Sequence, residues 1–175
     1  MVQSVELLLD PTLEAVVRQE WEILVAARAT RQLRRGGDPA VPHVTVGVAA
    51  SIPADVEAAL QSIDHGVGLE IRLGGLLLLG GHSSVLVRLV VPTAPLLELQ
   101  AKIWTAMQDC PGMPDTMRPG RWTPHVTLAR RFRSSDLPQT VELLGGRTGS
   151  VGVVAGMRRW DGDQRRGWLL SSAQR

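Results

Sequence analysis

Two short stretches of the same type carry the side chains best suited to chemistry. Residues 42–45 read Pro-His-Val-Thr, and residues 124–127 read the same, at an offset of 125 − 43 = 82. In a β-strand, residues two apart point to the same face, so each histidine shares a surface with its threonine. An imidazole exchanges a proton near neutral pH, and a hydroxyl donates a hydrogen bond to a phosphoryl oxygen. Each stretch is therefore a candidate half of a phosphate site.

The composition is that of a folded chain with a small positive charge. Of 175 residues, 44% are hydrophobic, and the net charge of +2 is too small to identify a nucleic-acid binder. No apolar run reaches the roughly 18 residues of a spanning helix, and the N-terminus lacks the order of a signal peptide. A single cysteine, Cys110, forms no internal disulfide, which agrees with a reducing compartment. We expect a cytoplasmic protein that does not associate with membranes.

The basic residues are almost all arginine. Only Lys102 of the nineteen Lys and Arg residues is a lysine. The guanidinium fork fits two phosphate oxygens, whereas an ammonium acts as a point charge. Arginines flank both histidine motifs, at positions 31, 34, 35, 118, 121, 130, 131 and 133. A solvated basic surface is the alternative interpretation for most of them.

Hydrophobic periodicity predicts the elements that must position the two motifs. Helices are expected over residues 12–33, 54–63, 93–109 and 137–144, since apolar residues recur there at spacings of three and four. Strands are expected over 2–9, 43–49, 69–73, 76–79, 85–91, 122–132, 151–160 and 167–171. Trp21, Trp160 and Trp168 are expected in the core, and His65 and His82 in exposed turns.

The same order of elements appears twice. At the offset of 82, Trp21 falls one place from Trp104, helical residues 55–63 fall on residues 137–145, and Gly74 falls on Gly156. We therefore predict one α+β domain over residues 1–175, built of two pseudo-repeat lobes of roughly 1–82 and 83–175. The lobes would be antiparallel sheets with outer helices, related by a pseudo-two-fold axis and flanking a central cleft.

At this point the sequence resembles a known family. Residues 122–130 read Trp-Thr-Pro-His-Val-Thr-Leu-Ala-Arg, similar to an aromatic-x-Pro-His-x-Thr-Leu-x-Arg pattern. The paired His-x-Thr motifs, about eighty residues apart, resemble those of the two-histidine phosphoesterase superfamily, which includes LigT-like 2′-5′ RNA ligases and cyclic phosphodiesterases. The resemblance covers essentially the whole chain. It implies a bilobal fold, no metal or other cofactor, and cleavage of a 2′,3′-cyclic phosphate to a 2′-phosphate, with reversible 2′-5′ ligation as a further activity.

The chemistry of the residues agrees with that implication. Opening a cyclic phosphodiester requires a water molecule to lose a proton and the leaving alkoxide to gain one, and two imidazoles can do both. The threonines would hold the non-bridging oxygens. The candidate catalytic residues are thus His43, Thr45, His125 and Thr127. The family assigns the acid to His43 and the base to His125, whereas the residues themselves leave the two roles interchangeable.

Substrate binding is expected at two further positions. The resemblance carries a binding role to Arg130. The chain has no tyrosine and one phenylalanine, Phe132, so Trp122 is the best candidate for stacking on a base, with packing in the core as the alternative. The expected partner is a nucleotide or RNA end bearing a cyclic phosphate, bound by a monomer.

Two other classes of function compete with this interpretation. Zinc requires three or four ligands, and neither motif contains a second histidine or a carboxylate, so we expect no metal. A non-catalytic RNA- or nucleotide-binding module of the same fold remains the alternative, because a fold does not guarantee turnover.

Overall fold

The computed structural model describes residues 2–27, 41–80 and 84–172. The expected end of the first helix, the arginines at 31, 34 and 35, and His82 lie outside the described residues.

Apart from two 3-10 turns, the described chain has the element order β-α-β-α-β-β-α-β-α-β-β. The strands are β1 (Gln3–Leu9), β2 (His43–Ala49), β3 (Glu70–Leu79), β4 (Ser84–Val90), β5 (His125–Phe132), β6 (Val151–Asp161) and β7 (Arg166–Ser172). The helices are α1 (Pro11–Ala26), α2 (Ala54–Ser62), α3 (Ala94–Met107) and α4 (Leu137–Leu144), with 3-10 turns η1 (Asp115–Met117) and η2 (Ser134–Asp136).

Helices α1 and α3 end earlier than predicted, at Ala26 and Met107, and two strand boundaries also differ by more than one residue. The expected strands 69–73 and 76–79 form the single strand β3, which bulges between Leu73 and Leu76 instead of ending at the glycine pair. The strand expected from residue 122 begins only at His125, directly after Pro124, which has no N–H for a ladder hydrogen bond.

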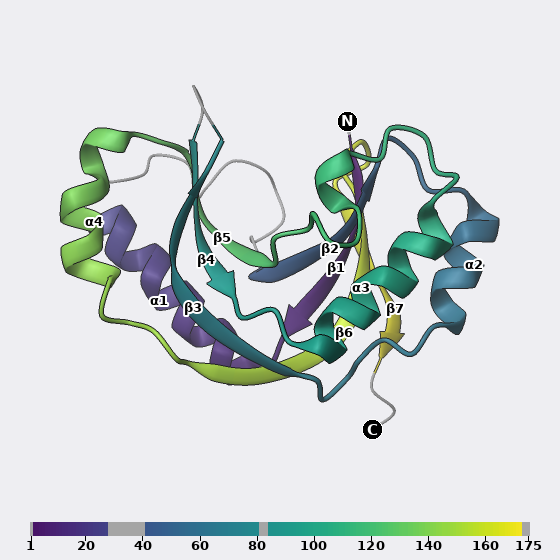
Figure 1. The fold of residues 1–175 in the computed structure, drawn as a ribbon, viewed down its shortest axis with the longest axis horizontal. Helices are drawn as coiled ribbons and strands as arrows, with labels where there is room; N and C mark the ends of the chain where they lie inside the picture. The colour runs from purple at the N-terminus through teal and green to yellow at the C-terminus, as the bar shows by residue number, and fades with distance from the viewer. Residues whose placement is uncertain (1, 28–40, 81–83, 173–175) are drawn as a thin grey trace.

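The seven strands form one antiparallel sheet, in which the two motif strands β2 and β5 are neighbours. In strand order β1-β2-β5-β4-β3-β6-β7, β1 also pairs with β6. We call β2, β1, β7 and residues 154–161 of β6 the His43 lobe, with α2 and α3 packed on it. The His125 lobe contains β5, β4, β3 and residues 151–153 of β6, with α1 and α4 packed on it. Figure 1 shows these two groups on either side of β2 and β5. The predicted α+β bilobal class is therefore confirmed.

The lobes do not follow the halves of the sequence. Helix α1 and strand β3 come from the first half but pack in the His125 lobe, and α3 and most of β6 come from the second half but pack in the His43 lobe. Each lobe of the sheet therefore takes strands from both halves of the chain, unlike the expected lobes of roughly 1–82 and 83–175 (Figure 1).

A capping carboxylate joins α1 to β6. Asp10 Oδ1 accepts hydrogen bonds from the N–H groups of Thr12 (2.9 Å) and Leu13 (3.2 Å), and Pro11 opens the first turn. Asp10 Oδ2 accepts from the N–H of Val153 at 2.6 Å. A Cβ at Gly152 would lie 2.1 Å from that oxygen, so only glycine leaves room for the cap.

A buried ion pair fastens α1 and α4 to the sheet below His125. Arg88 of β4 and Glu20 of α1 are both fully buried, and the Arg88 guanidinium is paired with the Glu20 carboxylate. The guanidinium also donates to the carbonyls of Leu144 (3.1 Å) and Gly74 (3.3 Å). Breaking such a pair leaves one buried charge without a partner, which is strongly destabilising, so this contact holds the helices in place.

Candidate active site

The structure places the two motifs side by side on neighbouring strands. Val44 of β2 pairs with Val126 of β5, and both valines are buried on the helix-covered face. In an antiparallel pair this register sets His43 opposite Thr127, and Thr45 opposite His125, on the other face. All four side chains are half-buried there. Diagonal residues on one face lie about 7–8 Å apart, so the two imidazoles can flank one small group.

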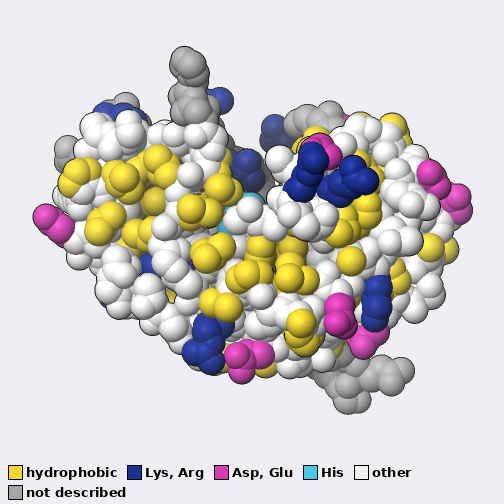
Figure 2. All heavy atoms as spheres, viewed as in Figure 1, with side chains coloured by type: hydrophobic (Ala, Val, Ile, Leu, Met, Phe, Trp, Pro, Cys, Tyr) yellow, Lys and Arg dark blue, Asp and Glu magenta, His cyan; other side chains and the backbone are white. Residues whose placement is uncertain are grey.

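Figure 2 shows this face as a hollow between the two lobes, with histidine exposed near its centre. The four predicted catalytic side chains therefore share one surface, although they come from positions 82 residues apart.

Both rings are fixed in the same orientation. The Nδ1 atom of His43 lies 2.7 Å from the carbonyl oxygen of Val41, and Nδ1 of His125 lies 2.7 Å from that of Thr123. A carbonyl oxygen only accepts, so Nδ1 donates in both contacts and carries the hydrogen. Nε2 is then the atom of each ring that can take up or release a proton.

Burial sets the protonation of one histidine. Burial lowers the pKa of His125 below its ordinary value, the hydrogen bond to Thr123 opposes this, and the charges of His43 and Arg130 lower the pKa further. Arg130 is exposed on β5. The second motif therefore presents an imidazole that is neutral near pH 7, beside a cation.

An indole N–H is bonded to each motif threonine through its backbone carbonyl. Trp122 Nε1 donates to the carbonyl of Thr45 at 3.1 Å, and Trp21 Nε1 donates to the carbonyl of Thr127 at 3.0 Å. The sequence predicted Trp21 as a core residue, and this hydrogen bond was missed because no local pattern reveals it. The Trp122 side chain is 8% exposed and belongs to the core, which favours packing over stacking on a base.

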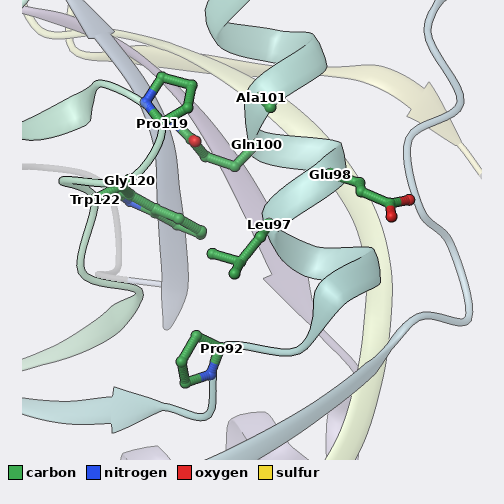
Figure 3. A pocket seen from close by; sticks show the side chains of 8 residues that line it. All are labelled: Pro92, Leu97, Glu98, Gln100, Ala101, Pro119, Gly120 and Trp122. Atoms are coloured by element: carbon green, nitrogen blue, oxygen red, sulfur yellow. The ribbon is translucent and has the colours of Figure 1, made fainter.

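One face of Trp122 borders a pocket of about 450 Å³ (Figure 3). The Trp122 ring and the Leu97 side chain point toward each other there, across a space between α3 and the loop that leads into β5. The lining residues are Pro92, Leu97, Glu98, Gln100, Ala101, Pro119, Gly120 and Trp122.

Glu6 is a site residue that the sequence reasoning missed. It lies on β1 opposite Thr45, with 4% of its surface exposed. Its Oε1 lies 3.4 Å from Nε2 of His43 and accepts from the Ser4 hydroxyl at 2.8 Å. Its Oε2 accepts from Nε of Arg158 at 2.7 Å. The available signal was a charged residue within the apolar run Val5–Leu9 of the strand.

The two walls of the hollow differ in polarity. In the His43 lobe, Arg158 lies over the ring of Trp160, 5.5 Å from its centroid, and Trp160 is opposite Ser4. In the His125 lobe, the positions opposite His125 and Thr127 are Leu89 and Val87. Trp160 was expected in the core, but it is half-buried on the polar wall because its strand position alternates with that of the core-facing Arg159.

Three other predicted roles can be compared with the structure. His65 was expected to be exposed, and this is wrong: it is 7% exposed, with Nε2 2.9 Å from the carbonyl of Leu60. Trp168 was expected in the core but is half-buried, and its N–H donates to Glu57 at 2.8 Å. Cys110 is buried, and burial raises the pKa of its thiol, as the packing interpretation requires.

The described residues show no cluster of three or more His, Cys, Asp or Glu side chains suited to a metal ion. Nor does any helix in the described ranges combine the length and hydropathy needed to cross a bilayer.

Comparisons with known proteins place the fold. A sequence model described as the 2′-5′ RNA ligase superfamily matches residues 48–153, which include the second motif and begin just after the first. No protein of curated function matches the sequence.

Solved structures of low identity share the whole architecture. The chain is similar to TT0787 of Thermus thermophilus at 16% identity and TM-score 0.62, covering 98% of this chain and 96% of that one. It is similar to E. coli LigT complexed with 3′-AMP at 14% and 0.55, covering 98% and 94%. It is also similar to Kluyveromyces marxianus Usb1 at 12% and 0.54, covering 97% of each.

Proposed function

Because the chain belongs to the 2′-5′ RNA ligase superfamily of LigT-like phosphoesterases and ligases, we propose that it hydrolyses 2′,3′-cyclic phosphates to 2′-phosphates. The observation that carries this proposal is the pair of half-buried imidazoles on adjacent strands, each fixed through Nδ1 with Nε2 left for proton transfer. Reversible 2′-5′ ligation would be the same ring-opening step with the 5′-hydroxyl of a second RNA end in place of water.

The hydrolytic step needs only the chain's own groups and one water molecule. The water oxygen attacks phosphorus while His125 Nε2 accepts its proton. The P–O3′ bond breaks, its electron pair stays on O3′, and the Nε2–H of His43 delivers a proton to that oxygen. The products are a 2′-phosphate and a 3′-hydroxyl, and proton exchange with solvent restores both rings.

The roles follow from the surroundings of the two rings. A general base must begin neutral, and burial lowers the pKa of His125 so that its neutral form predominates near pH 7. His43 then acts as the acid, in agreement with the family's assignment. Thr45 and Thr127 would donate hydrogen bonds to the non-bridging oxygens as charge develops on them.

Arg130 and Trp122 support this reaction in different ways. The exposed guanidinium of Arg130, whose charge already acts on His125, attracts the phosphate. Trp122 is buried, and its N–H holds the carbonyl of Thr45, so we assign it to positioning the first motif rather than to stacking.

The proposed partner is a nucleotide or an RNA end with a cyclic phosphate. Of the similar structures, E. coli LigT is complexed with 3′-AMP and, in another structure, with NADP+, and K. marxianus Usb1 with uridine monophosphate. We further propose a cytoplasmic monomer without metal or cofactor, in which residues 1–175 form one domain because strands from both halves join in one sheet.

The test is hydrolysis of 2′,3′-cyclic mononucleotides with and without EDTA, with products separated by chromatography. His43→Ala and His125→Ala should each lose about 10²- to 10⁴-fold in kcat. His65→Gln is the matched control, since that histidine is buried away from the motif strands. Nucleotide binding without turnover by the unmodified protein would refute the proposal in favour of a binding module.

A further inference from the structure

The carboxylate of Glu6 makes the two-histidine site asymmetric. On the face shared by the two motifs, Glu6 is opposite Thr45 in the His43 lobe, and Val87 is opposite Thr127 in the His125 lobe. The charged residue next to Val87, Arg88, is fully buried with Glu20 on the helix side. One imidazole therefore has a carboxylate neighbour, and the other has hydrophobic side chains and Arg130.

The geometry points to Glu6 as a positioning residue that keeps the transferable proton on His43 and so assigns the acid's role to that ring. This inference rests on the proposed function and concerns which ring supplies the proton to the leaving oxygen.

Glu6 is held firmly enough to act this way. Its carboxylate is 5% exposed and has three partners: the Ser4 hydroxyl, the Arg158 guanidinium and the His43 ring. The first two donate, which fixes both oxygens and leaves Oε1 facing Nε2 of His43. A carboxylate accepts only, so its contact with Nε2 is attractive when that nitrogen carries a hydrogen.

The distance between Glu6 and His43 suits a ring that must give up its proton. At 3.4 Å the contact between Oε1 and Nε2 is longer than a strong charge-assisted hydrogen bond of about 2.7–2.9 Å. The Nε2–H can therefore pass its proton to a leaving oxygen without first breaking a tight hydrogen bond. Arg158, whose side chain is 13% exposed, offsets the charge of Glu6 and so limits its repulsion of a phosphate.

Within the described residues, the His125 side has no such carboxylate partner. The charges that act on His125 are those of His43 and Arg130, and both oppose its protonation. The two rings are thus prepared for opposite roles, one by a carboxylate and the other by burial and nearby cations.

The decisive experiment compares two leaving groups. A 2′,3′-cyclic mononucleotide expels an alkoxide that needs a proton, whereas a 4-nitrophenyl phosphodiester expels a nitrophenolate that does not. Glu6→Gln keeps the shape but removes the charge. It should lower kcat on the cyclic nucleotide about 10- to 100-fold, part of the range for acid catalysis, and lower kcat on the nitrophenyl ester less than about threefold.

Glu20→Gln is the matched control. It removes the charge of another buried carboxylate that faces the helix side, so any loss of activity should be equal for the two substrates. Equal losses in Glu6→Gln, or none, would overturn the inference. If Glu6→Gln does not fold, Glu6→Gln/Arg158→Met leaves no unpaired charge and serves in its place.

A second readout needs no turnover. In ¹⁵N-labelled protein at acidic pH, the Nε2–H signal of His43 should be sharp, and it should broaden in Glu6→Gln while the ring signals of His125 stay unchanged. If that change is seen in a protein that hydrolyses neither substrate, the proposed function fails while the contact between Glu6 and His43 stands. An unchanged His43 signal in Glu6→Gln refutes the inference.

Discussion

The indole hydrogen bonds to the motif threonines can be removed one at a time. In Trp21→Phe, the Thr127 carbonyl loses its indole donor, and in Trp122→Phe the Thr45 carbonyl loses its donor. Phenylalanine keeps an aromatic ring in each place. Each variant therefore tests how far the motif strands depend on a bond that comes from outside the sheet.

The expected cost follows from burial at each site. Trp122 is 8% exposed and Trp21 is half-buried, so water replaces the lost donor poorly, and an unsatisfied buried acceptor costs about 1–3 kcal/mol. For a domain of this size, 1 kcal/mol corresponds to roughly 2–4 °C in Tm, so each variant should melt about 2–12 °C lower. Trp122→Phe should show the larger loss because its site is the drier one.

Thermal unfolding followed by circular dichroism measures the shift. Trp104→Phe is the matched control: Trp104 is also half-buried against the core, and it shows no hydrogen bond from its indole within the described residues. The loss in that variant estimates the contribution of the smaller ring alone. If Trp21→Phe and Trp122→Phe melt within about 1 °C of Trp104→Phe, the carbonyls do not depend on the indoles and the reasoning is wrong.

Three further outcomes are expected. Arg88→Met should lower the free energy of unfolding by about 3–5 kcal/mol, because it leaves the Glu20 carboxylate buried without a partner. Arg72→Met should lower it by less than about 1 kcal/mol, because the pair of Arg72 with Glu70 is exposed, and equal urea midpoints of the two variants would contradict this. In the free enzyme, kcat/KM should fall as pH drops through the pKa of His125, which lies below 6.5. The free energy of unfolding should also fall as pH drops from 6.5 to that pKa, because the unfolded chain binds more protons there than the native state. The His125→Ala variant should have a flatter profile of stability against pH. Arg130→Ala should raise KM and weaken inhibition by phosphate about two- to fivefold, the range of an exposed charge contact. Arg133→Ala should change neither, because the Arg133 guanidinium is paired with Asp136. An unchanged KM in Arg130→Ala would mean that the Arg130 side chain points away from the hollow.

The parts of the fold that depend on local pattern were predictable from the sequence. Alternation and helical spacing gave the order of the elements, and the repeated His-x-Thr motif gave the two strands that meet. The register that sets His43 opposite Thr127 depends on one bridge between Val44 and Val126, which no local signal specifies.

What the sequence could not show are contacts between segments far apart in the chain. Glu6 and Arg158 are 152 residues apart, and Trp21 is 106 residues from the carbonyl that it binds. A glutamate on an apolar strand could have faced solvent, and a tryptophan in an amphipathic helix could have been packed without any polar role. The positions of Glu6 and Trp21 are both decided by contacts between the two halves of the chain, which cross between the lobes.

That crossing has a consequence for how the protein folds. Strand β1 pairs along its length with β6, joining Gln3 to Asp161 across 158 residues, so the His43 lobe cannot close until almost the whole chain is present. Contacts this distant must overcome a large loop-closure entropy and are associated with slow folding. A chain cut between β3 and β4 would leave each fragment with unpaired strand edges and a helix whose sheet belongs to the other fragment. The two lobes therefore form a single cooperative unit, and two such fragments should regain ordered sheet only when they are mixed.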